Sequence, residues 1–150
     1  MSTFSGKYYY TLDPKGRVMI PASLREVISA NYGSKLYLTN TVGDGCLTVY
    51  PQEEWVLMMD KAKGLPSSNR AAKWFMRHVI GSAVEVNMDK QGRVQVPSAL
   101  RVDAGLDGEI VIVGQINRIE VWDRNRWNAA MDVSAEDQGA FEKELGALGI

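Results

Sequence analysis

The stretch LDPKGRVMIPASLR at residues 12–25 returns as MDKQGRVQVPSALR at residues 88–101. From position 13 to position 25, seven of thirteen residues are identical in the two copies. Weaker similarity continues beyond each motif and ends at a tryptophan, Trp55 in the first copy and Trp127 in the second. Self-similarity at a nearly fixed offset is the signature of a repeated structural unit. The sequence therefore predicts a chain built from two related halves.

Each copy has the pattern of four short strands. In the second copy, Val84, Val86 and Met88 alternate with polar residues, which is the period-2 pattern of a half-buried strand. An Asp-x-x-Gly segment follows, in which the aspartate can bond its own downstream backbone and Gly16 or Gly92 can take a positive φ. We therefore expect a tight hairpin turn at each glycine, after which the chain returns as a strand.

Prolines and capping residues mark the expected helices. Pro21 and Pro97 follow the returning strands and can open short helices, where their missing N–H costs nothing. A second helix in each copy is expected to carry Trp55 or Trp127 on its buried face. Two further helices are expected: one from Arg70 to about Ile80, capped by Asn69 and with an apolar stripe of Ala71, Trp74, Phe75, His78 and Val79, and one in the tail, where Ser134 and Asp137 resemble a capping box.

The strand pattern also predicts how the halves combine. Short strands cannot each bury a face alone, because an isolated hairpin is marginal in water. We therefore expect an α+β, β-rich fold in which the two repeats interleave into one barrel with short peripheral helices and a pseudo-two-fold axis. The expected organisation is a first repeat over residues 1–63, a linker and connecting helix over 64–82, a second repeat over 83–131 and a tail helix over 132–150.

Composition excludes several classes of protein. The chain has 150 residues, 45% of them hydrophobic and 23% charged, which suits a small globular protein. It has neither the apolar run of about 20 residues that spans a membrane nor a signal peptide, so we expect a cytoplasmic protein without a membrane partner. Cys46 is the only cysteine and His78 the only histidine. We therefore expect no disulfide, metal site, cofactor or small-molecule substrate, and we expect His78 to be a packed, hydrogen-bonded residue.

The charge is distributed unevenly between the halves. Residues 1–80 carry ten Lys and Arg against six Asp and Glu, a net +4, whereas residues 81–150 carry seven against twelve, a net −5. A polyanion would prefer the first half. The opposite charges also favour contact between the first half of one copy and the second half of the next. Such a head-to-tail contact closes into a ring or continues as a filament.

The doubled motif, together with GQINRIEVWD at residues 114–123, resembles the MraZ family, bacterial relatives of the AbrB and MazE swapped-hairpin DNA-binding proteins. The resemblance extends to about Asp132. It implies a tandem-repeat double swapped-hairpin β-barrel, homo-oligomeric rings, and a nucleoid-associated transcriptional regulator. Such a regulator binds double-stranded DNA at short direct repeats upstream of cell division and cell wall genes.

The resemblance also suggests DNA-contacting residues. In the family the first Asp-x-Lys-Gly-Arg turn supplies the contacts, which map onto Lys15, Gly16 and Arg17. Arg93 is the counterpart in the second turn, where the sequence departs from the family pattern because Gln91 replaces the lysine. An arginine at a narrow turn can make a bidentate contact to guanine, and a neighbouring lysine can meet a phosphate.

Structural roles compete with these assignments. Arg17 and Arg93 could equally be solvated or paired with Asp13 and Asp89, and the residues alone do not decide between these roles and DNA contact. Arg25 and Arg101 follow the helix-opening prolines in both copies whatever the local charge. We therefore expect these two arginines to tie the helices to carbonyls or carboxylates of the barrel.

Two other functions remain as alternatives. One is a protein-binding or antitoxin-like module that does not need DNA. The other is an enzyme on a related barrel, with Ser23 or Ser98 as nucleophile. The enzyme is disfavoured because no base is placed near either serine, and because the serine does not keep its place between the copies.

Overall fold

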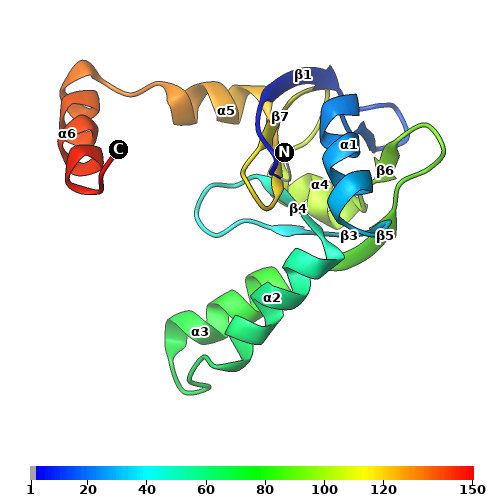
Figure 1. Cartoon of the computed structure of the whole chain (residues 1–150), viewed down its shortest axis with the longest axis horizontal. Helices are drawn as coiled ribbons and strands as arrows, with labels where there is room; N and C mark the ends of the chain where they lie inside the picture. Colours follow the sequence, from blue (N-terminus) through cyan, green and yellow to red (C-terminus); the bar gives the residue numbers. More distant parts are fainter. Residues whose placement is uncertain (1–2) are drawn as a thin grey trace.

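The expected strands are all present and pair in antiparallel fashion in the computed structural model, which describes residues 3–150 (Figure 1). They form one six-stranded sheet and one separate two-stranded ribbon. The strands are β1 (Lys7–Thr11), β2 (Arg17–Met19), β3 (Lys35–Asn40), β4 (Leu47–Pro51), β5 (Val84–Asn87), β6 (Arg93–Gln95), β7 (Glu109–Gly114) and β8 (Ile119–Asp123).

The strands of the two repeats interleave, as the sequence predicts. The large sheet has the order β1-β7-β8-β4-β3-β5, and the ribbon pairs β2 with β6. The first-repeat strand β1 therefore lies beside β7 of the second repeat, and the second-repeat strand β5 lies beside β3 of the first. Exchanging every strand with its counterpart in the other repeat simply reverses the strand order. The topology thus has the expected pseudo-two-fold symmetry.

Two details of the expected barrel are different. The described strands do not close into a barrel, because β1 and β5 are the edges of the large sheet and are joined by no ladder. The tight Asp-x-x-Gly turns are present, but the two arms of each turn pair with strands of the other repeat and not with each other, since β1 pairs with β7 whereas β2 pairs with β6. The physical reason is strand length: β2 and β6 have three residues each and pair with one another. They contribute no ladder to either edge of the large sheet.

Helices begin where prolines and capping side chains predict. Pro21 and Pro97 are the N-cap residues of α1 and α4, and the Asn69 side chain accepts from the Ala72 N–H at 3.0 Å. In the tail, Ser134 Oγ accepts from the Asp137 N–H at 3.1 Å. The helices are α1 (Ala22–Asn31), α2 (Gln52–Lys63), α3 (Arg70–Phe75), the π-helix η1 (Met76–Ile80), α4 (Ser98–Ala104), α5 (Arg124–Met131) and α6 (Ala135–Ala147).

The connecting helix differs from its expected form. It changes from an α-helix to a π-helix at Met76. Val79 is buried, but Trp74, expected in the apolar stripe, is 48% exposed. His78 packs as expected: its ring stacks on Trp74 with centroids 4.6 Å apart, and its Nε2 lies 3.3 Å from the Thr41 carbonyl oxygen.

The large sheet has apolar side chains on both faces. On β7, Ile110 and Ile112 belong to the main core cluster, whereas Val111 and Val113 face a second cluster with Trp122. The main cluster joins the sheet to α1, α4 and the β2–β6 ribbon. Figure 1 shows α2 with α3, and α5 with α6, extending away from this core in different directions. None of the helices within residues 3–150 is long and apolar enough to cross a membrane.

Candidate nucleic-acid interface

The two Asp-x-x-Gly turns have the same hydrogen-bond pattern. Asp13 Oδ1 accepts from the backbone N–H groups of Lys15 and Arg17, both at 2.9 Å. The Gly16 N–H donates to the Asp13 carbonyl oxygen at 3.0 Å, with φ +77° at Gly16. In the second turn, Asp89 Oδ1 accepts from the N–H groups of Gln91 and Arg93 at 2.9 Å, and Gly92 has φ +84°.

Each turn holds its arginine with an ion pair. Arg17 Nε donates to Asp13 Oδ2 at 2.6 Å, and Arg93 Nε donates to Asp89 Oδ2 at 2.9 Å. The pairing that competed with DNA contact is therefore present. It uses only Nε, however, and within residues 3–150 the terminal Nη atoms of both arginines make no hydrogen bond to protein. A guanidinium has five N–H donors, so the donors on the two terminal nitrogens of each arginine remain available for another partner.

The two aspartates stay charged well below neutral pH. The Arg17 backbone N–H is the main cause that lowers the pKa of Asp13, and the Arg17 and Lys15 contacts outweigh the opposing effect of desolvation. The Arg93 backbone N–H lowers the pKa of Asp89 in the same way. Both carboxylates therefore hold their arginines throughout the physiological pH range.

The β2–β6 ribbon brings the two arginines to one face. Val18 lies opposite Val94, and both are buried in the main core. Because side chains alternate along a strand, Arg17 and Arg93 lie on the other face of the ribbon. Arg17 pairs with Gln95, two positions from Arg93 on the same strand. The two arginine positions are thus about 7 Å apart along the ribbon.

Two polar residues at the ribbon were not assigned from the sequence. Gln95 Nε2 donates to the Lys15 carbonyl oxygen at 2.8 Å and so braces the first turn. Its counterpart in the other repeat is Met19, whose side chain has no N–H to donate. Lys90 is exposed in the second turn, where the first has Pro14, so each turn carries one exposed lysine. Both residues stand at positions where the repeats differ, which is the signal that could have revealed them.

Arg25 and Arg101 have the structural role that the sequence predicts. Arg25 Nη1 donates to the Ile20 carbonyl oxygen at 2.6 Å, and Arg101 Nη1 donates to the Val96 carbonyl oxygen at 2.7 Å. Each also packs against the turn glycine of the other repeat. A Cβ added to Gly16 would lie 1.9 Å from Arg101 Nη1. Gly16 is therefore buried, and it serves the shape of the turn.

The residues considered for catalysis have other surroundings. Ser23 Oγ shares a hydrogen bond with the Tyr8 hydroxyl, and either oxygen can be the donor. Ser98 is exposed at the start of α4. Burial raises the pKa of the Cys46 thiol to about 12, which makes it unreactive. Within residues 3–150, no three side chains of His, Cys, Asp or Glu gather as a metal site.

The doubled motif has a match among known families. A family model described as "MraZ protein, putative antitoxin-like" matches residues 3–78 and again residues 79–145. The chain belongs to the MraZ family. This confirms the resemblance carried by the doubled motif, and the two matches cover the two halves of the chain.

Relatives in the MraZ family match over most of their length. A protein of Clostridium beijerinckii named transcriptional regulator MraZ is 38% identical over 147 residues, which cover 98% of this chain and 99% of that protein. A protein of Carboxydothermus hydrogenoformans with the same name is 46% identical over 125 residues, covering 83% and 84%. A solution structure from Pyrococcus horikoshii aligns with 83% of this chain and 99% of its own, at 16% identity and a TM-score of 0.35.

Proposed function

We propose that this MraZ-family chain is a sequence-specific DNA-binding transcriptional regulator, without catalysis or cofactor. The observation that carries the proposal is the β2–β6 ribbon, whose outer face holds two arginines with free guanidinium ends. A two-stranded β-ribbon fits the major groove of B-DNA. The names of the relatives support the regulatory role.

The contacts divide between bases and backbone. Arg17 and Arg93 are held by their Nε atoms, so their terminal nitrogens can donate side by side to O6 and N7 of guanine. Lys15 and Lys90 flank them as exposed charges for phosphates. Arg17 is the principal contact, because Gln95 braces its turn. We place the protein at the nucleoid in the cytoplasm, acting on short direct repeats upstream of cell division and cell wall genes.

One ribbon offers few contacts, and a few phosphate contacts give weak, salt-sensitive binding. We therefore propose that several copies assemble head to tail into a ring, so that their ribbons engage successive DNA repeats and gain affinity through multivalency. The interleaved strands support the double swapped-hairpin architecture, with repeats over 1–63 and 83–131, a connecting segment over 64–82 and a tail over 132–150. Sedimentation at moderate salt tests the assembly: a monomer or a simple two-fold dimer would contradict it.

Binding to the DNA upstream of the protein's own gene tests the function. We expect the affinity to fall steeply from low to moderate salt, while the preference over a shuffled DNA of equal composition persists. The same affinity for both DNAs would contradict sequence-specific recognition.

The "antitoxin-like" description of the family model favours one second candidate, a protein-binding module. It predicts capture of a protein partner that is insensitive to salt and unaffected by changes on the β2–β6 ribbon. The salt series therefore separates the two functions, because only DNA binding depends on the release of counterions.

A further inference from the structure

The tail helix α6 is an unpartnered element with an apolar stripe. None of its residues is buried, and none belongs to the three hydrophobic clusters formed within residues 3–150. Phe141 and Leu145 lie on α6 and Leu148 is its C-cap residue. Their spacings of four and three residues place them on one side of the helix. They are 49%, 42% and 77% exposed. Three apolar side chains aligned in this way indicate a contact surface.

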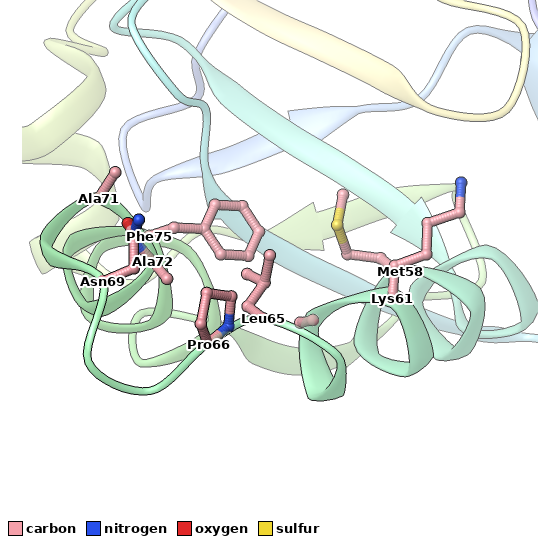
Figure 2. Close-up of a pocket in the computed structure, with 9 residues that line it drawn as sticks. Met58, Lys61, Leu65, Pro66, Asn69, Ala71, Ala72 and Phe75 are labelled. Atoms are coloured by element: carbon pink, nitrogen blue, oxygen red, sulfur yellow. The ribbon is translucent and has the colours of Figure 1, made fainter.

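A groove of complementary character lies between α2 and α3. It has a volume of about 440 Å³ and is lined mainly by apolar side chains. Figure 2 shows Met58 on the α2 side and Phe75 on the α3 side facing the space between the two helices, with Leu65 at the connecting loop. Leu65 is 42% exposed. The groove is thus open to an apolar helix face.

The charges around the two surfaces are opposite. Residues 132–147 carry five carboxylates and one lysine, a net −4. Residues 60–80, which form the end of α2, the loop, α3 and η1, carry five Lys and Arg and one Asp, a net +4. Of these five cations only Lys63 has an ion pair within residues 3–150, with Asp60 at 3.7 Å. The other four are Lys61, Arg70, Lys73 and Arg77.

We propose that α6 of one copy docks into the α2–α3 groove of the next copy. Phe141, Leu145 and Leu148 enter the groove, and the carboxylates of the tail meet the cations at its rim. The helix does not reach the α2–α3 pair of its own chain, because only residues 132–134 join α5 to α6, and α5 with α6 extends away from the core in a different direction from α2 with α3 (Figure 1). The contact is head to tail, since helix and groove are different surfaces. It rests on the assembly proposed above and names its interface.

A complementation experiment tests the docking. Leu145→Glu places a charge on the apolar stripe of α6, and Leu65→Glu places a charge in the apolar groove. The two side chains have the same exposed fraction, 42%. Val102→Glu is the control, because Val102 is 75% exposed on α4, away from both surfaces. We expect the unaltered chain and the control to sediment as the same large species, and each docking variant alone to sediment as a monomer.

The mixture of the two docking variants gives the decisive result. Each has one intact surface, so an equimolar mixture should form a one-to-one dimer and nothing larger. The proposal is overturned if either variant assembles like the unaltered chain, if the mixture stays monomeric, or if the unaltered chain is itself a monomer.

DNA binding is measured on the same samples with a single operator repeat. Both docking variants keep Arg17 and Arg93, so they should bind this short DNA like the unaltered chain. Intact single-repeat binding with failed complementation overturns the docking alone. Complementation without any DNA binding overturns the DNA-binding proposal alone.

Discussion

Arg17 is held in place by the aspartate of its own turn. Its Nε is paired with Asp13 at 2.6 Å, while its side chain keeps 26% of its surface exposed. A side chain that is already ordered loses less conformational entropy on binding. The ion pair that competes with DNA contact in a reading of the sequence therefore orients the arginine for such a contact.

Arg17→Ala should weaken binding to one operator repeat by roughly 10- to 100-fold, because a bidentate base contact contributes about 1–3 kcal/mol. The fold should not change, since the guanidinium end contacts no core residue. Arg17→Lys is the matched variant: it should keep much of the salt-dependent affinity and lose the sequence preference. Fluorescence anisotropy on operator and shuffled DNA checks both, and wild-type affinity in Arg17→Ala would show that the contact is misassigned.

Arg93→Ala should cause a smaller loss than Arg17→Ala. The second turn has no counterpart of the Gln95 brace, because Met19 occupies the equivalent position. The same anisotropy measurement compares the two variants side by side. Equal losses would mean that the ribbon binds symmetrically, and the assigned preference for the first turn would have to be given up.

The sequence predicted the roles of the residues that recur in both repeats. It did not predict the contacts of residues that differ between the repeats. Arg25 and Arg101 recur with the same spacing, and both do bind carbonyls of the strands. Gln95 contacts Lys15, a residue 80 positions away. No local pattern predicts such a contact, because it depends on the pairing of β2 with β6.

The two Asp-x-x-Gly turns and the β2–β6 ribbon position the arginines of the candidate site, Arg17 and Arg93. Gly16 combines a left-handed backbone with a close approach of Arg101. Arg25 makes the equivalent approach to Gly92 from the other repeat. The shape of each turn in one repeat therefore depends on the helix of the other.

Gly16→Ala should destabilise the protein more than Gly43→Ala. Both glycines have left-handed φ, +77° and +83°, where an added Cβ costs roughly 1–2 kcal/mol. At Gly43 nothing lies within 4 Å of that Cβ, whereas at Gly16 the Cβ must displace Arg101 from the Val96 carbonyl. Urea unfolding of both variants measures the difference. An equal shift of the two midpoints would show that the Arg101 contact contributes nothing.

The stability that the two turns contribute should decrease at acid pH. Because the folded-state pKa of Asp13 and Asp89 is lowered from 3.8, their contribution to stability is complete above about pH 5 and is lost as the pH falls through the lowered values. Carboxyl NMR titration should give midpoints below 3.8 for both, and Arg17→Ala should raise that of Asp13 alone. A midpoint at or above 3.8 in the unaltered protein would contradict the observed hydrogen bonds.

The sequence patterns predicted the strands and helices, but they did not predict which strands pair with each other. The eight strands and the starts of the helices follow from alternation, prolines and caps. The tight turns formed as expected, but their arms pair with strands of the other repeat, because a tight turn fixes the direction of the chain and not the strand with which each arm pairs. The π-helix at Met76 carries no local sequence signal. The exposure of Trp74 was also missed, because an apolar stripe on a short helix does not say which of its residues the sheet covers.

The whole molecule is a single interleaved unit with two projecting helical surfaces. The repeat and the weakness of isolated hairpins were enough to predict the interleaving and its pseudo-two-fold symmetry. Barrel closure did not follow, since it depends on ladders at the edges that short strands do not supply. The outward positions of α6 and of the α2–α3 pair are visible only in the structure (Figure 1), and α6 and the groove lined by α2 and α3 are the surfaces through which we propose that copies assemble.

Footprinting on the DNA upstream of the protein's own gene tests the central claim most directly. If the arginine faces of several assembled ribbons bind successive repeats, the unaltered protein should protect short, regularly spaced segments on one side of the double helix. The Arg17→Ala, Arg93→Ala double variant should protect none of them at the same concentration. Protection that is absent with the unaltered protein, or unchanged in the double variant, would contradict the account.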